Sequence, residues 1–256
     1  MPSRPQYALM SSKDKNIVLF VCFSSAVLFF DFLIYLYMVD VISVAFFPTS
    51  ADSAISRLQG LGLFAIGYLA RPIGGIIFGR YGDIKGRKPV LLISMLVTAA
   101  CMLAMAFLPT YAQWGFAAPA LFIVLRIIQG MAFGVFAPLT WIFVAEHVPR
   151  QYLSAGCSYV IASFLLGVLF SNAFFIWLTA SMTTEQLITD GWRLPFIVAA
   201  ILSFLPLLAW RFISESPFFI EMKAQKPSKC FTKPVSLLFK HCKHSLFIVM
   251  ILTLII

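Results

Sequence analysis

The stretch ALFIVLRIIQGMAFGVFAPLTWIFVA occupies residues 120–145 and contains one charged side chain, Arg126. At about 1.5 Å per residue, a helix of this length crosses the roughly 30 Å hydrocarbon core of a bilayer. We therefore expect Ala120–Ala145 to be a membrane span. Five further apolar segments have a comparable length: Ile17–Val39, Leu58–Phe78, Val90–Leu108, Leu153–Ala180 and Leu194–Ile213.

Composition supports a membrane protein built from these six segments. Hydrophobic residues make up 61% of the chain and charged residues 11%, whereas about 25% of a soluble domain is charged. So few charges cannot cover a surface that faces water. The sequence predicts an all-α integral membrane protein, with a bundle of six transmembrane helices over residues 17–213.

Several other classes of protein are disfavoured. The net charge of +9 comes from basic residues in short segments between apolar runs, without a continuous patch, so we expect no nucleic-acid partner. The three histidines lie in predicted loops and no nucleophile motif is present, so we expect neither an enzyme nor a cofactor. The group Cys230, His241, Cys242 and His244 lacks the paired spacing of a metal site.

The basic residues also predict the orientation in the membrane. If the connections between spans alternate sides, only Arg57 and Arg193 lie on the side opposite the N-terminus. Every other Lys and Arg outside the spans lies on the N-terminal side. The positive-inside rule therefore predicts a cytoplasmic N-terminus. We expect the membrane to be a plasma membrane, of the bacterial inner-membrane type.

The remaining segments are predicted from their polarity. Residues 1–16 form a cytoplasmic leader, and residues 214–244 form a basic linker with an interfacial helix near Phe218–Lys223. A seventh apolar run covers residues 245–256 and reaches only about halfway across the hydrocarbon layer. We expect it to be a truncated seventh transmembrane helix.

Charges inside membrane spans are costly and mark functional sites by default. Three charged residues stand out inside the predicted spans. Asp31 is a candidate for proton or substrate coupling, or else a structural partner for Arg126. Arg126 and Gln129 lie one helical turn apart, so their side chains can converge for coupling; a snorkelling arginine on a packing helix is the alternative. We interpret Arg71 as a structural charge in the membrane.

Polar side chains in the first and fifth spans suggest a substrate cavity. On the first span Tyr35 shares a helical face with Asp31. Tyr159 and Ser163 follow each other in a step of four on the fifth span, with Asn172 further along. Such residues can line a cavity for a small polar or ionic metabolite, although helix packing explains the fifth span nearly as well.

The loop GRYGDIKGRK, residues 79–88, is the strongest local signal. It contains Gly79, Asp83 and Gly86, followed by the basic pair Arg87 and Lys88. Asp83 can cap a helix start, and Arg87 can pair with Asp83 or with a neighbouring helix end. We interpret the loop as a cytoplasmic gate.

These strings resemble motifs of the major facilitator superfamily. The loop at 79–88 looks like its signature between helices two and three, and Arg126-x2-Gln129-Gly130 resembles its helix-four motif, whose arginine is associated with proton coupling. Four further strings are similar to the metabolite:proton symporter family, with the sugar porters as the nearest alternative: RPIGG at 71–75, AEHVPR at 145–150, ESPF at 215–218 and DFxxY at 31–35.

The resemblance implies the N-terminal half of a two-bundle transporter, with substrate bound between the bundles. It implies proton-coupled uptake of an organic acid, amino acid or osmolyte such as proline or betaine, and it adds Glu146 and Arg150 to the predicted gate. A sugar-porter-like transporter is the alternative family. A non-transporting remnant is another possibility, as is a bundle that needs a partner: the missing C-terminal half, a separate chain or a second copy.

Overall fold

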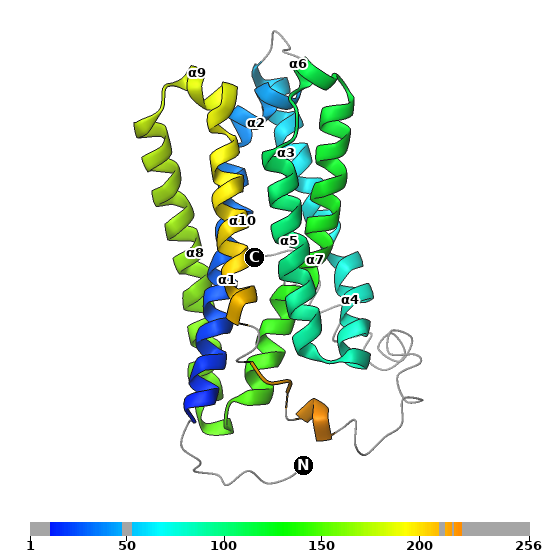
Figure 1. Ribbon diagram of the computed structural model, residues 1–256, viewed down its shortest axis with the longest axis vertical. Coiled ribbons are helices and arrows are strands. Elements are labelled where there is room, and N and C mark those ends of the chain that lie inside the picture. The colour runs from blue at the N-terminus through cyan, green and yellow to red at the C-terminus, as the bar shows by residue number, and fades with distance from the viewer. Residues whose placement is uncertain (1–10, 48–52, 210–212, 217, 222–256) are drawn as a thin grey trace.

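The computed structural model describes residues 11–47, 53–209, 213–216 and 218–221, and every regular element in these ranges is helical. Figure 1 shows long helices running side by side, with short helices at one end. In chain order the elements are α1 Ser12–Tyr37, α2 Val39–Phe46, α3 Ser53–Leu69, α4 Arg71–Lys85, α5 Arg87–Ala106, α6 Tyr111–Trp114, α7 Ala117–His147, η1 Arg150–Tyr152, α8 Leu153–Ser181, α9 Thr184–Gln186, the π-helical turn η2 Leu187–Gly191 and α10 Arg193–Leu208.

Each predicted span corresponds to helix in the described residues, although α10 ends at Leu208. Within the described ranges five helical segments are long and apolar enough to cross a membrane, and a sixth is added when η2 and α10 count as one bent span. The first helix begins at Ser12, within the stretch assigned to the leader, because Ser11 caps it. The Ser11 hydroxyl accepts a hydrogen bond from the Lys13 amide, and Asp14 accepts one from the Ser11 amide.

The second span is broken near its middle. The sequence predicts one helix over Leu58–Phe78, but the structure has α3 and α4 meeting at Ala70. Pro72, which lacks a backbone N–H, follows this point, so the preceding turn loses a helical hydrogen bond. The break places Arg71 at the first position of α4, in the interior of the span.

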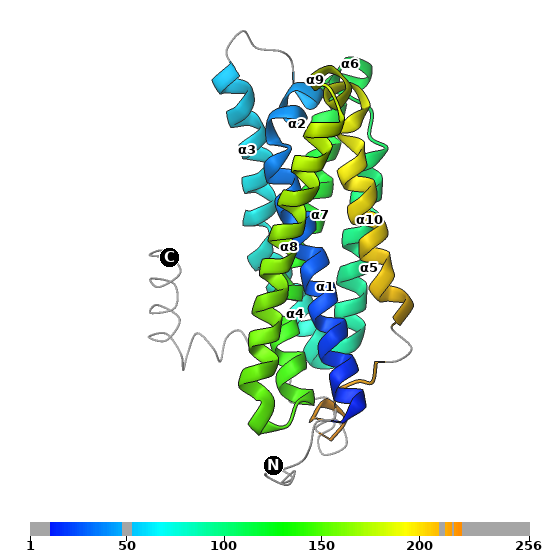
Figure 2. The ribbon, with the colours of Figure 1, turned by 90° about the vertical axis from the view of Figure 1, so that its left-hand side faces the viewer.

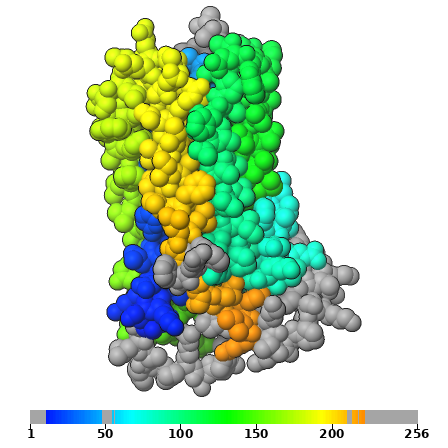
Figure 3. All heavy atoms as spheres, viewed as in Figure 1, coloured from blue at the N-terminus to red at the C-terminus, as the bar shows by residue number. Residues whose placement is uncertain are grey.

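Two long helices, α1 and α7, each contact several neighbouring helices. α1 packs against α8 and α10, whereas α7 packs against α3, α4 and α5. Figure 2 shows α8 beside α1, with α3 at the edge of the bundle. On the face seen in Figure 3, the yellow side chains of α10 lie directly against the green ones of α5.

The contact between α7 and the α3–α4 pair depends on glycine. A Cβ atom on Gly130 would overlap the carbonyl oxygen of Gly67, and one on Gly134 would overlap the carbonyl oxygen of Arg71. The helices therefore approach more closely than any side chain would allow, which is the packing expected for these two glycines.

Two apolar clusters fill the bundle. One gathers large aromatic side chains, with Trp192 edge-on to both Phe46 and Phe196. The other lies toward the opposite end and contains Phe136 and Phe143 of α7. The polar site described next lies between α1, α3, α4 and α7.

Some predicted features fall outside the described residues. These are most of the leader, the linker beyond residue 221, the seventh helix over 245–256, and the group Cys230, His241, Cys242 and His244. Of the predicted interfacial helix, the structure describes a helical turn at residues 218–221. Within the described ranges, no three metal-capable side chains gather into a site.

Candidate functional site

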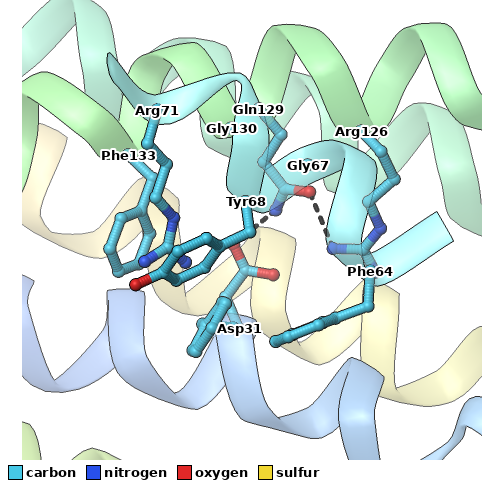
Figure 4. Close-up of a pocket in the computed structure, with 10 residues that line it drawn as sticks. Asp31, Phe64, Gly67, Tyr68, Arg71, Arg126, Gln129, Gly130 and Phe133 are labelled. Carbon is cyan, nitrogen blue, oxygen red and sulfur yellow. Dashed lines mark hydrogen bonds between the residues drawn. The ribbon is translucent and has the colours of Figure 1, made fainter. Parts of the chain in front are cut away.

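A chain of polar side chains connects α1 with α7 inside the bundle. The Arg126 Nη1 donates to the Gln129 Oε1 at 2.9 Å, and the Gln129 Nε2 donates to the Asp31 Oδ2 at 2.6 Å. Figure 4 shows Gln129 between the carboxylate and the guanidinium. All three side chains are buried, with exposed fractions of 1% to 6%. The carboxylate and the guanidinium are thus joined through an amide.

Several atoms of this network keep unused hydrogen-bonding capacity. Asp31 Oδ1 and two guanidinium nitrogens of Arg126, Nε and Nη2, are buried and have no hydrogen-bond partner in the described structure. The Arg126 guanidinium lies 3.8 Å from the centre of the Tyr35 ring. Buried polar groups are rarely left unpaired, and exceptions concentrate at functional sites.

These groups open onto a pocket between α1, α3, α4 and α7. Its empty volume is about 340 Å³, part of it open to the outside. A second hollow shares Tyr68, Arg71 and Phe133 with the first and extends along α4 and α7. The first pocket is lined by Asp31, Phe32, Phe64, Gly67, Tyr68, Arg71, Arg126, Gln129, Gly130 and Phe133.

The residues expected in a substrate cavity do not line this pocket. Tyr35 is fully buried beneath Arg126, and its hydroxyl donates to the Gly60 carbonyl at 3.0 Å. Tyr159 and Asn172 are exposed on the outside of α8. Ser163 donates to the Val160 carbonyl of its own helix. None of the four is among the residues that line the pocket.

The face of α8 that carries Ser163 packs against α1. A Cβ atom on Gly167, one turn further along, would overlap the carbonyl oxygen of Ala26. At this face the structure shows helix packing, which is one of the two interpretations that the sequence left open.

The predicted gate residues gather at the junction of α4 and α5. The Arg87 guanidinium pairs with Asp83, and its Nε lies 3.6 Å from the Glu146 Oε1 of α7. Gly86 joins the two helices with a φ of 115°, a conformation that favours glycine. Asp83 lies inside α4 and caps no helix start, so only its expected pairing with Arg87 is found.

The remaining gate residues contribute less to this cluster. Arg150 begins η1 on the connection after α7, and a Cβ atom on Gly79 would meet nothing within 4 Å. Lys88 donates from its Nζ to the Ile213 carbonyl at 2.6 Å. This bond ties the start of α5 to the segment that follows α10.

Glu215 completes the cluster, and sequence reasoning did not assign it to the gate. Its carboxylate accepts from the backbone amides of Arg87 at 3.0 Å and Lys88 at 3.2 Å, so it caps α5. A negative charge at a helix start is stabilising. The one available signal was its place in the ESPF string, which carries no indication of a partner 128 residues away.

Comparison with known proteins identifies the family. Residues 17–230 match the family described as Sugar (and other) transporter. This chain belongs to that family. It is a multi-pass membrane protein of a transporter family and not an enzyme, as the sequence predicts.

Relatives of this transporter family include curated proteins from two bacteria. The chain is 33% identical over 225 residues to the inner membrane metabolite transport protein YhjE of Escherichia coli, covering 88% of this chain and 51% of that protein. It is 32% identical over 228 residues to the "Putative proline/betaine transporter" of Staphylococcus aureus (strain COL), covering 86% and 47%. The chain thus spans about half the length of the curated relatives it matches.

Solved transporter structures show the same fold. The proton:xylose symporter XylE, a major facilitator superfamily protein, superposes with a TM-score of 0.76 at 21% identity, over 84% of this chain and 48% of that one. A partially occluded, inward-open XylE from E. coli gives a TM-score of 0.75 at 20% identity, over 83% and 52%. The expected major facilitator fold is confirmed.

Proposed function

We propose that this chain is the N-terminal half of a secondary transporter that couples proton entry to uptake of a small organic acid, amino acid or osmolyte such as proline or betaine. The observation that carries the proposal is the buried network of Asp31, Gln129 and Arg126 at a pocket. Two relatives are named for transport of metabolites and of proline or betaine, and XylE is named a proton symporter.

In this proposal Asp31 is the group that accepts and releases the proton. When its carboxylate is ionised, it offsets one of the two arginine charges of the pocket, Arg71 and Arg126. When it is protonated, that offset is lost and Gln129 bridges a neutral acid to a cation. The charge available to a substrate therefore changes by one with each proton, which is the requirement for coupling.

The cluster around Arg87 serves as the cytoplasmic gate. It ties α4, α5, α7 and the segment after α10 together at one end of the bundle. The excess of Lys and Arg on this side supports a cytoplasmic N-terminus in a bacterial inner membrane. Opening would break the pairs of Arg87 with Asp83 and Glu146 as the bundles rock about the central site.

A half-transporter that needs a partner bundle is the second candidate. The spans containing α3–α4 and α8 are the least buried: 22% of the most apolar stretch of each is buried, against 44% to 61% in the other three continuous spans. These two spans lie on either side of α1 and α7. Their open faces suit contact with a second bundle, which could be a C-terminal half, a separate chain or a second copy.

Uptake measurements test the proposal. Cells that express this chain would be given labelled proline, betaine and dicarboxylates, with and without a pH gradient. We expect gradient-dependent uptake that is lost in Asp31→Asn and Arg126→Gln. Arg57→Gln is the matched control, because Arg57 lies at the surface, paired with Asp40 at 3.2 Å.

Each outcome has a defined meaning. Uptake that is unchanged in Asp31→Asn and Arg126→Gln would refute the coupling roles. No uptake, from a chain shown to be in the membrane, would favour the half-transporter. Crosslinking would then distinguish a pair of identical bundles from a complex with another chain.

A further inference from the structure

Arg71 is the one charged side chain of the pocket that has no hydrogen bond or ion pair to another described residue. Asp31 and Arg126 are linked through Gln129. Every ion pair found among the described residues involves other side chains. The Arg71 Nε is buried and has no hydrogen-bond partner there. The guanidinium thus keeps donors that the described protein does not use.

Three aromatic rings hold the Arg71 guanidinium in place. Its central carbon lies 3.8 Å from the centre of the Phe133 ring, 4.2 Å from that of Phe32 and 4.4 Å from that of Tyr68. Figure 4 shows it beside the rings of Phe133 and Tyr68, on the side of the pocket away from Arg126. Rings contact a guanidinium through its faces, whereas its N–H donors point outward in its plane.

This arrangement suits a carboxylate. A planar guanidinium presents two parallel N–H donors that match the two oxygens of a carboxylate. The aromatic contacts orient the donors before a ligand arrives, so less conformational entropy is lost on binding.

The location of Arg71 gives a ligand access to it. Arg71 lies at the break between α3 and α4, and it lines both the central pocket and the adjoining hollow along α4 and α7. Tyr68, which shares both spaces, is 55% exposed. A ligand can therefore reach Arg71 from the adjoining hollow, which Tyr68 and Phe133 also line.

The net charge of the pocket favours an anionic ligand over a zwitterion. With Asp31 ionised, the lining residues carry one negative and two positive charges, and the surplus charge is that of Arg71. Among the lining residues Asp31 is the one carboxylate, and Gln129 already engages it. The ammonium group of a zwitterion would have to share this carboxylate with Gln129, because Oδ1 is its one unpaired oxygen.

We propose that Arg71 is the carboxylate-binding residue of this pocket and that the ligand is a small monocarboxylate with an apolar or aromatic body. The proposal rests on the proposed function, because it assumes that the pocket receives substrate. It narrows the substrate class to anions, and it changes the role of Arg71 from a structural charge to a ligand contact.

Direct binding tests the proposal without requiring transport. The purified chain in lipid nanodiscs would be equilibrated with labelled benzoate and, separately, labelled lactate, with no gradient. Benzamide, lactamide and betaine would serve as competitors. We expect saturable binding of at least one carboxylate, with its amide counterpart and betaine competing at least about tenfold more weakly.

Two variants and a control locate the site. We expect Arg71→Gln to weaken carboxylate binding by at least about tenfold. Arg71→Lys keeps the positive charge but lacks the two parallel donors. Its affinity for the carboxylate should therefore lie between those of the wild type and Arg71→Gln. Arg57→Gln, at the surface, should bind like the wild type. If Arg71→Gln aggregates in gel filtration or loses its helical circular dichroism signal, the comparison of acid with amide on the wild-type chain still decides the proposal.

Four results would overturn it: equal binding by Arg71→Gln and the wild type, equal competition by acid and amide, tighter binding of betaine than of either acid, or no saturable binding of either acid. Failure of transport is distinguishable. Arg71-dependent binding without uptake in cells would leave the site standing and refute transport by this chain, whereas uptake that is unchanged in Arg71→Gln would refute the site alone.

Discussion

Replacing Gln129 with leucine tests the polar network most sharply, because leucine has a similar size but can neither donate nor accept a hydrogen bond. The Gln129 amide makes two such bonds, one from Arg126 at 2.9 Å and one to Asp31 at 2.6 Å. Both partners are charged and buried. In the variant each would lose the bridge that joins it to the other.

The size of the effect follows from these contacts. A hydrogen bond to a charged group contributes about 1.5–3 kcal/mol, so losing two gives an upper limit of roughly 3–6 kcal/mol. Breaking a buried charged network by removing one member typically costs about 3–5 kcal/mol. In the variant, Arg126 and Asp31 can approach each other directly, which would recover a part of the lost free energy. We expect the free energy of unfolding to fall by about 3 kcal/mol.

The assay is equilibrium unfolding of the chain in dodecyl maltoside micelles by added sodium dodecyl sulfate, followed by circular dichroism. Thr98→Val is the matched control. The Thr98 side chain is buried, its hydroxyl has no hydrogen-bond partner in the described structure, and valine keeps its shape. A loss in Gln129→Leu below about 1 kcal/mol, or no larger than that in Thr98→Val, would refute the bridging role.

Three further substitutions test other contacts. Glu215→Ala should raise hydrogen exchange of the first two backbone amides of α5 by about ten- to a hundredfold, since each loses a charged acceptor; exchange no faster than in the exposed-site control Ser214→Ala would contradict the cap. Gly130→Ala should lower the free energy of unfolding by about 1–3 kcal/mol, because its Cβ overlaps an α3 carbonyl. Gly79→Ala is the control, because a Cβ atom there meets nothing within 4 Å, and it should leave the free energy of unfolding unchanged. Equal losses in Gly130→Ala and Gly79→Ala would contradict the close approach of α3 and α7. Tyr35→Phe loses one hydrogen bond to α3 and should cost about 0.5–1.5 kcal/mol in the same unfolding assay; no measurable loss would show that this bond is not needed.

The sequence was sufficient to predict the helices because each apolar segment is as long as the bilayer is thick. The break at Ala70 was not predicted, although Pro72 inside the span is its local signal, because proline cannot donate to the preceding turn. The pairing of Arg126 with Gln129 followed from their spacing of three residues. Local chemistry determines features of this kind.

Contacts between distant segments were not predictable. The rings around Arg71 come from three spans, contributed by Phe32, Tyr68 and Phe133, and helical periodicity cannot indicate which residues of different helices meet. Periodicity likewise places residues on a common face without indicating what that face contacts. For this reason the sequence could not indicate that Tyr159 is exposed on α8 and does not line the pocket.

The pocket and the gate cluster are built on the same two helices, so their shapes depend on each other. α4 carries Arg71 at its first residue and Asp83 near its last turn, about 18 Å apart along the axis at 1.5 Å per residue. α7 carries Arg126 at the pocket and Glu146 at the gate. Because glycine brings the backbones of α4 and α7 into direct contact, a change in their crossing angle cannot be absorbed by side chains.

The helical hydrogen bonding is also interrupted near the pocket in both spans, the one that contains α4 and the one that contains α7. The α3–α4 break precedes Arg71 directly, and Pro138 interrupts the hydrogen bonding of α7 between the pocket and the gate. A bend at these points would turn the gate ends of α4 and α7 relative to the pocket. The Arg87 guanidinium contacts both helices there, through Asp83 and Glu146, so such a turn must stretch at least one of its two pairs. Release of the gate and a change in the position of Arg71 are therefore parts of the same movement.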